Sequence, residues 1–326
     1  IHLPHTWNTD AYTEKKYYQG TGWYRRQISI PQSWKEKQIF LKLDATSKAA
    51  TIYINGKKVG EHTGGYTACT FDITPFCSLN TPNSLAVCVD NSRQDIPPIS
   101  GDFTFFGGIY RDVWLTAVSK QHFHLTNYGS EGIFISTPKV SEEKGTILIR
   151  GDIKNDATQK ALLELEHIIY HPNGSIAQSL KQSIQIKAGE QYSFRSETSP
   201  ILSPQLWTPE TPHLYRVESI LRDKKTKTVL DQSNHYTGFR WFSFDGERGF
   251  SLNGKPYKLR GICRHQDQKP IGVALTDEMH RRDIKLMKEM GANFIRISHY
   301  PQDDALLEMC DKLGMLAWEE IPIIDI

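Results

Sequence analysis

The chain has 326 residues, of which 38% are hydrophobic and 23% are charged, a composition typical of an ordinary globular protein. Its net charge is only +2 and it has no basic run, so electrostatics gives no reason to expect a nucleic acid or an anionic membrane as partner. No apolar stretch approaches the roughly 20 residues that span a bilayer. The length favours two or three domains over one.

Residues 1–119 have the pattern of an all-β domain. Short alternating runs are separated by Gly, Pro and Asn, and Asn55-Gly56 is typical of a tight hairpin turn. The predicted strands are Trp23–Ile30, Gln38–Leu43, Ala50–Ile54, Thr70–Ile73, Ser84–Asp90 and Asp112–Ala117. Strands at this spacing predict a β-sandwich or jelly roll.

Residues 120–240 form a second all-β unit in this interpretation. Thr146–Lys154, Ala161–Tyr170 and Ser183–Lys187 alternate, and the turn sequence His171-Pro172-Asn173-Gly174 lies between the last two. We expect this unit to be a spacer and packing partner with no chemistry of its own. No long Pro/Ser linker follows it, so the domains should pack tightly.

The hydrophobic period changes after Leu252, where strands begin to alternate with helices. The predicted strands are Tyr257–His265, Asn293–Ser298 and Met315–Ile321. One helix should begin at a Thr276 N-cap and end before Gly291, and a second should run from an Asp303 N-cap to Gly314. This alternation predicts βαβ units and a parallel sheet.

Polar side chains follow each of these three strands. They are Arg264, His265 and Asp267 after the first, His299 and Tyr300 after the second, and Glu319 and Glu320 after the third. Ligands of parallel α/β sheets and barrels bind outside the carboxyl ends of the strands. The sequence therefore predicts one side of an active site here.

Three ordered motifs in this region resemble the catalytic barrel of glycoside hydrolase family 2, which contains β-galactosidases, β-glucuronidases and β-mannosidases. The matching segments are 252–256 with 260–267, 293–301, and 310–322. Residues 4–8, 107–113 and 205–215 resemble earlier parts of the family. The resemblance implies a multidomain, mainly β protein: a jelly-roll sugar-binding domain at 1–119, an immunoglobulin-like β-sandwich at 120–240, and the first part of a (β/α)8 TIM barrel at 241–326.

The resemblance also implies substrate-binding residues. Asp102, on an aromatic- and glycine-rich loop, falls where β-galactosidases carry an acid that reaches the sugar pocket; rings beside a carboxylate suit a sugar. His299 would bind sugar hydroxyls, Arg296 would orient a carboxylate, and His265 and Glu320 would line the same face. The alternatives are a turn aspartate at Asp102, a helix-capping histidine at His299 and a structural ion pair at Arg296.

We expect no catalytic residue in this chain. Retaining glycosidases use two carboxyl groups about 5–5.5 Å apart. Glu319 and Glu320 cannot supply the pair, because adjacent strand residues point to opposite faces. The family's catalytic glutamates lie on later strands, and a complete barrel needs about 250 residues. The chain is therefore expected to be the N-terminal fragment of a retaining exo-β-glycosidase, inactive alone.

Residues 107–113 favour a β-galactosidase over a β-glucuronidase or β-mannosidase. Two other classes stay open: a non-catalytic carbohydrate-binding β-sandwich protein, and a tandem-sandwich scaffold that leaves the polar strand ends unexplained. The expected partner is a carbohydrate, with a homo-oligomer left open. We expect no cofactor in this stretch and free thiols at the 5 cysteines. The resemblance leaves open a divalent cation in the full enzyme, with ligands mostly beyond residue 326. The compartment is also left open, with a periplasmic or secreted location favoured over a cytoplasmic one.

Overall fold

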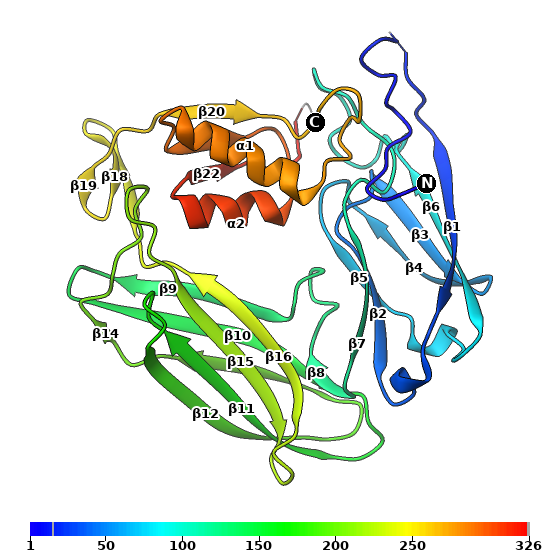
Figure 1. The fold of residues 1–326 in the computed structure, drawn as a ribbon, viewed down its shortest axis with the longest axis horizontal. Helices are drawn as coiled ribbons and strands as arrows, with labels where there is room; N and C mark the ends of the chain where they lie inside the picture. Colours follow the sequence, from blue (N-terminus) through cyan, green and yellow to red (C-terminus); the bar gives the residue numbers. More distant parts are fainter. Residues whose placement is uncertain (15, 325–326) are drawn as a thin grey trace.

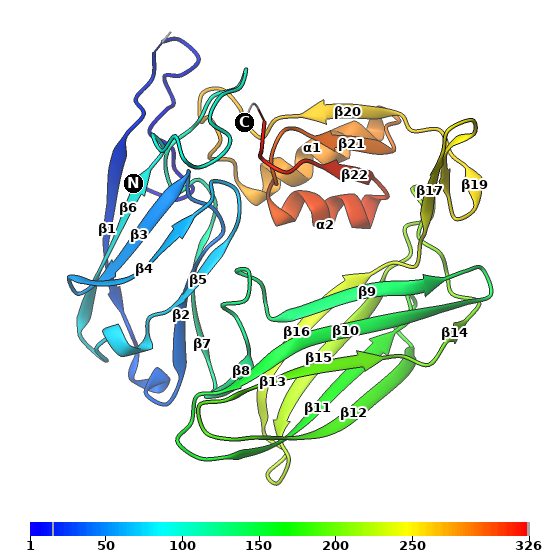
Figure 2. The same ribbon diagram turned by 180° about the vertical axis from the view of Figure 1, so that it is seen from behind.

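The computed structural model describes residues 1–14 and 16–324, which form three packed units (Figures 1 and 2). Two β-sandwiches lie side by side, and a smaller α/β unit near the C-terminus packs over the second and beside the first. The architecture is mainly β and confirms the predicted fold class. Among the described residues, no helix is both long and apolar enough to cross a membrane.

The first sandwich has two antiparallel sheets around an aliphatic core. One sheet has the order β1-β6-β3-β4, and the other has the order β5-β2-β7. The strands are β1 (Thr21–Ser29), β2 (Gln38–Leu43), β3 (Ala49–Ile54), β4 (Lys57–Thr63), β5 (Cys69–Asp72), β6 (Pro82–Asp90) and β7 (Val113–Val118), with short 3-10 helices at Gln32–Trp34 and Thr74–Phe76. Asn55 and Gly56 have φ of 53° and 78°, as their β3–β4 hairpin turn requires.

The second sandwich has two sheets. In one, the long strand β10 pairs with β8, β9, β13 and β14, and this sheet packs against the sheet β12-β11-β15-β16. Its strands are β8 (Gln121–Phe123), β9 (Ile133–Val140), β10 (Lys144–Asn155), β11 (Ala161–Tyr170), β12 (Ile176–Ile186), β13 (Gln191–Glu197), β14 (Ile201–Leu202), β15 (Tyr215–Asp223) and β16 (Val229–Thr237). The predicted strand Ser183–Lys187 is only the end of β12, because the half-buried positions Gln178 and Gln182 earlier in the strand are polar and interrupt the apolar alternation.

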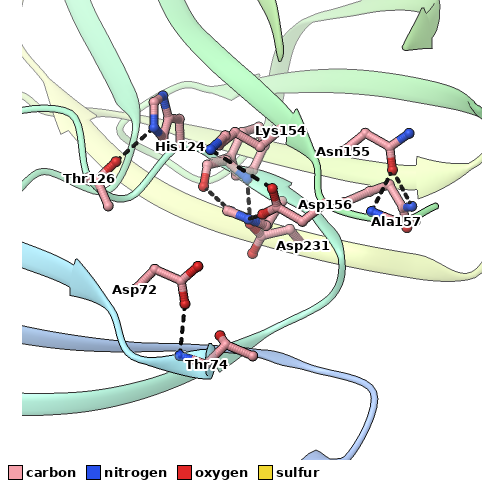
Figure 3. A network of polar contacts seen from close by, with 12 residues as sticks. Asp72, Thr74, His124, Thr126, Lys154, Asn155, Asp156, Ala157 and Asp231 are labelled. Carbon is pink, nitrogen blue, oxygen red and sulfur yellow. Dashed lines mark hydrogen bonds and ion pairs between the residues drawn. The ribbon is translucent and has the colours of Figure 1, made fainter. Parts of the chain in front are cut away.

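The two sandwiches meet at β8, where His122 is fully buried. Its ring nitrogens lie 2.9 Å from Asp156 Oδ2 and 2.6 Å from the Phe123 carbonyl oxygen, and its ring packs edge-on against Phe40 of the first sandwich. Nearby, Asp231 accepts a hydrogen bond from the Phe123 backbone; Figure 3 shows Asp156 and Asp231 side by side at this junction. At the junction with the α/β unit, Trp207 of the second sandwich is buried with Leu252 and Leu316, and its ring nitrogen donates to the Asp311 carbonyl at 2.9 Å, so the tight packing expected there is present.

The α/β unit begins with a small sheet and continues as a parallel sheet of three strands. Strands β17 (Phe242–Asp245), β18 (Gly249–Leu252) and β19 (Lys255–Pro256) precede β20 (Gly261–Arg264), α1 (Asp277–Glu289), β21 (Phe294–Ile297), α2 (Asp304–Leu313) and β22 (Leu316–Glu319). The order β20-β21-β22 is parallel, as predicted, although each strand is shorter than expected.

The helix ends follow the predicted signals with one correction. Asp303 caps α2 by accepting a hydrogen bond from the Ala305 backbone, and Gly314 and Gly291 take left-handed φ values of 76° and 88°. Thr276 occupies the N-cap position of α1, but its side chain makes no capping hydrogen bond in the described structure. The first turn of α1 is instead favoured by the charges of Asp277 and Glu278.

Candidate functional site

The strand register places the polar strand ends together. Cys263, Arg296 and Trp318 are neighbours across β20, β21 and β22, so their side chains share the face of the sheet opposite the helices. The residues that continue this face beyond the strands include His265 and Glu320. The ends of the three strands therefore form one surface, as the sequence predicted.

Glu320 is the centre of a charged network on this surface. Arg296 Nε donates to Glu320 Oε1 at 2.5 Å, and His299 Nδ1 lies 2.7 Å from Oε2. Burial alone would raise the pKa of Glu320, but the hydrogen bonds from His299 and Arg296 outweigh it and hold the pKa below its usual range. The arrangement keeps Glu320 ionised and directs the imidazole of His299.

Glu319 lies in a different environment from its neighbour. Burial raises the pKa of Glu319, and Arg111 and Asp304, which lie toward the helices, are among the charged groups that act on it. Arg111 itself reaches the loop after β21 from the first sandwich. The two adjacent glutamates therefore face different surroundings, which agrees with the expectation that only one faces the site.

His265 and His299 lie against an aromatic side chain from the first sandwich. The ring of Phe103 is 5.7 Å from that of His265 and 5.9 Å from that of His299, and the two imidazoles are 5.1 Å apart. Burial and the charge of His299 lower the pKa of His265, whereas the charges of Asp267 and Asp102 act in the opposite direction. Asp102 is exposed beside Phe103 at the rim.

The structure thus brings together all five predicted site residues: Asp102, His265, Arg296, His299 and Glu320. Sequence reasoning did not single out Phe103, although it recognised the aromatic loop that carries it. It also grouped Arg264 with the site, but Arg264 is buried on the helix side, where it binds Asp283 of α1. Tyr300 is buried behind the site in a parallel stack on Tyr66 at 4.3 Å, with its ring 5.4 Å from that of Phe103.

A cavity of about 970 Å³ lies where the three units meet. Asp44, Asp112, Asp277 and Asp303 are among its lining residues. Burial raises the pKa of Asp112, and the charges of Asp277, Asp303 and Asp44 raise it further, so these carboxylates act on one another. Among the described residues, no group of three or more His, Cys, Asp or Glu side chains is arranged to hold a metal ion.

Family models match the chain in three consecutive stretches. The sugar binding domain of glycosyl hydrolases family 2 matches residues 4–119, a second model of that family matches 131–240, and its TIM barrel domain matches 246–326. The chain belongs to glycosyl hydrolase family 2.

Relatives in this family carry more than one name. The crystal structure of Bacteroides uniformis β-glucuronidase is 78% identical, with a TM-score of 0.99 over 100% of this chain and 39% of that chain. The same enzyme has been solved as a calcium binding mutant with two Asp→Ala substitutions, with a TM-score of 0.95. A β-glucuronidase of Bacteroides fragilis is 36% identical over 99% of this chain and 46% of its own length. A β-galactosidase of Thermoanaerobacter pseudethanolicus is 33% identical over 99% and 42%. The family 2 chain therefore spans less than half the length of these relatives.

Proposed function

We propose that the whole protein is a retaining exo-β-glycosidase that acts on β-glucuronides, and that this family 2 chain supplies the sugar-binding side of its active site. The observation that carries the proposal is the 78% identity, over the whole chain, with the Bacteroides uniformis β-glucuronidase. A β-galactosidase, the expectation from residues 107–113, is the second candidate because a relative of that name is 33% identical.

The chemistry of the strand-end surface supports an acidic sugar. Arg296 is 42% exposed, so its guanidinium keeps hydrogen-bond donors available beyond the pair with Glu320. His265 and His299 add ring nitrogens, and Phe103 adds an apolar face of the kind that packs on the CH groups of a sugar. Charge-assisted donors suit a carboxylate and hydroxyl groups, while Asp102 and Glu320 accept from hydroxyls.

We further propose that this chain alone does not hydrolyse glycosides. A retaining mechanism needs a nucleophilic carboxylate and a carboxyl that acts as acid and then base, about 5–5.5 Å apart. Glu320 is engaged by Arg296 and His299, and Glu319 has a different environment. In this proposal the catalytic pair comes from the remainder of the protein, and the residues of this chain bind and orient the sugar.

Hydrolysis of aryl β-glucuronide, β-galactoside and β-mannoside tests the proposal, with the whole protein and the 326-residue chain assayed side by side. We expect the whole protein to cleave the glucuronide best, and the short chain to cleave none. His299→Ala and Asp102→Ala in the whole protein should each lower kcat/KM by at least about 10-fold, because each removes a hydrogen-bonding group from the sugar. Preference for the galactoside would favour the second candidate, and turnover by the short chain would contradict the absence of a catalytic pair.

We also propose that Asp277 and Asp303 take part in a calcium site of the whole protein. The two substituted aspartates of the calcium binding mutant are 26 positions apart in sequence, as are Asp277 and Asp303. No other two aspartates in this chain have this separation. Carboxylate oxygens are the donors that Ca²⁺ prefers, together with backbone carbonyls and water. The mutual repulsion of carboxylates around Asp112 is the local charge excess that a cation would neutralise.

Each of the two aspartates lies beside an arginine in this structure. Asp277 pairs with Arg281 at 2.6 Å, and Asp303 Oδ2 lies 3.9 Å from Arg111 Nε. Titration calorimetry with CaCl₂ should detect binding to the unmodified whole protein and none to its Asp277→Asn or Asp303→Asn variants. Asp283→Asn, on the same helix as Asp277 but outside the cavity lining, is the matched control. Equal binding by all four proteins would contradict the assignment.

A further inference from the structure

The first sandwich contacts the loops that follow β20 and β21 through a small number of hydrogen bonds. Tyr12, near the N-terminus, donates its hydroxyl hydrogen to Asp267 Oδ2 at 2.8 Å. Arg111, just before β7, donates through Nη2 to Gln266 Oε1 at 3.1 Å and to the Pro301 carbonyl at 2.6 Å. These acceptors lie directly beside His265 in one loop and near His299 in the other.

We infer that Tyr12 and Arg111 are positioning residues of the active site, which hold the loop after β20 and thereby fix His265 toward the sugar. The inference deepens the proposed function, because it takes the strand-end surface as the sugar site. It assigns the first sandwich a second task besides carrying Asp102 and Phe103. The site would be complete only when that sandwich is docked on the barrel strands.

Burial makes these contacts effective. Arg111 is 6% exposed and Gln266 is 1% exposed, so their hydrogen bond is shielded from water and would be expensive to leave unmade. The ring of Tyr12 packs against Phe106 of the first sandwich, with centroids 6.1 Å apart, which directs the phenol toward the loop. The loop is therefore held at the two residues that follow His265, Gln266 by Arg111 and Asp267 by Tyr12, and Arg111 also ties it to Pro301 of the neighbouring loop.

His265 also depends on its surroundings for its charge. Its Nδ1 lies 3.3 Å from the hydroxyl of Tyr300, and the charged groups that act on its pKa are His299, Asp267, Asp102 and Glu320. Asp267 is the group among these that Tyr12 orients. A Tyr12 that positions Asp267 must therefore influence the titration of His265, which a merely structural tyrosine would not do.

The test follows the imidazole of His265 by NMR in the histidine-labelled 326-residue chain, with its resonance assigned from His265→Gln. Asp267→Asn removes a charge that raises the pKa of His265, so the midpoint should fall. Tyr12→Phe keeps the ring but frees the carboxylate to turn toward water, so the midpoint should fall by a smaller amount. Tyr18→Phe is the matched control, because among the described residues its hydroxyl bonds the nearby Thr21 carbonyl alone.

A His265 midpoint that is unchanged in Tyr12→Phe overturns the inference, as does an equal fall in Tyr18→Phe. In the whole protein, Tyr12→Phe should lower kcat/KM on the preferred aryl glycoside by roughly 10-fold, since small displacements of a positioning group are costly. The thermal midpoint should match that of Tyr18→Phe. Because the NMR titration needs no substrate, a shift in Tyr12→Phe without any glucuronide turnover would leave the positioning role standing and reject the glucuronidase.

Discussion

The buried guanidinium of Arg264 gives the sharpest test of the energetics of the α/β unit. Its side chain is 4% exposed and makes two hydrogen bonds to Asp283 Oδ2, at 2.8 and 2.7 Å. A third bond runs to Gln302 Oε1 at 2.5 Å. It therefore links β20 to α1 and to the segment that precedes α2.

We predict that Arg264→Met lowers the free energy of unfolding of this unit by about 3 kcal/mol. Gln302 is 2% exposed, so its unpaired amide oxygen should cost about 1–3 kcal/mol. Asp283 is 38% exposed and can be hydrated, so the lost ion pair should add only about 1 kcal/mol. Methionine replaces the apolar stem of the arginine and leaves little empty volume.

Hydrogen exchange of α1 and β21 amides measures this change, because it reports the opening of one unit separately from the rest of the chain. Arg282→Met is the matched control, since Arg282 is exposed on the same helix. A loss in Arg264→Met that is within about 1 kcal/mol of the control would refute the reasoning, because the orphaned buried amide would then carry no cost.

The same substitution should change the acid response of the unit. Burial, followed by the charge of Arg264, lowers the pKa of His280 to about 3. His280 is therefore neutral when folded but binds a proton when unfolded, so stability falls as the pH drops from 6.5 toward 3. Without the arginine charge the folded pKa rises, and the fall in stability should become shallower.

Three further predictions concern other parts of the chain. Gly291→Ala should lower the free energy of unfolding by about 1–2 kcal/mol, because the alanine must adopt a left-handed φ. Gly314→Ala should lower it clearly more in calorimetry, because its Cβ would also lie 2.4 Å from the Pro209 carbonyl oxygen. Equal losses in the two variants would contradict this. Because the pKa of Glu320 is lowered in the folded state, its stabilising effect is complete above pH 4.5 and is lost as the pH falls through the lower folded pKa. In urea titrations, Glu320→Gln should therefore make the free energy of unfolding depend less on pH below 4.5. A thiol reagent should modify exposed Cys263 first and the buried Cys69 and Cys310, whose pKa burial raises to about 12, only on unfolding; early loss of the Cys310 thiol would contradict the structure.

The sequence carried the order of the domains and most of the candidate site. The signals that predicted the elements are local and depend on backbone conformation: the alternation with period two, the turn at Asn55-Gly56, and the caps at Asp303 and Gly314. Polar residues placed after three predicted parallel strands had to meet at one edge, and His265, His299 and Glu320 do so. The motifs of family 2 pointed to the same residues.

Only the tertiary structure decided which side chains lie on the strand-end surface and which lie against the helices. The pleat of β20 already requires Arg264 and His265 to point to opposite faces, but only the packing of α1 shows that Arg264 is the buried one, against Asp283. The contacts of Tyr12 with Asp267 and of Arg111 with Gln266 join residues far apart in the chain. Pairings of this kind depend on how one domain docks on another, and no local propensity or period encodes them.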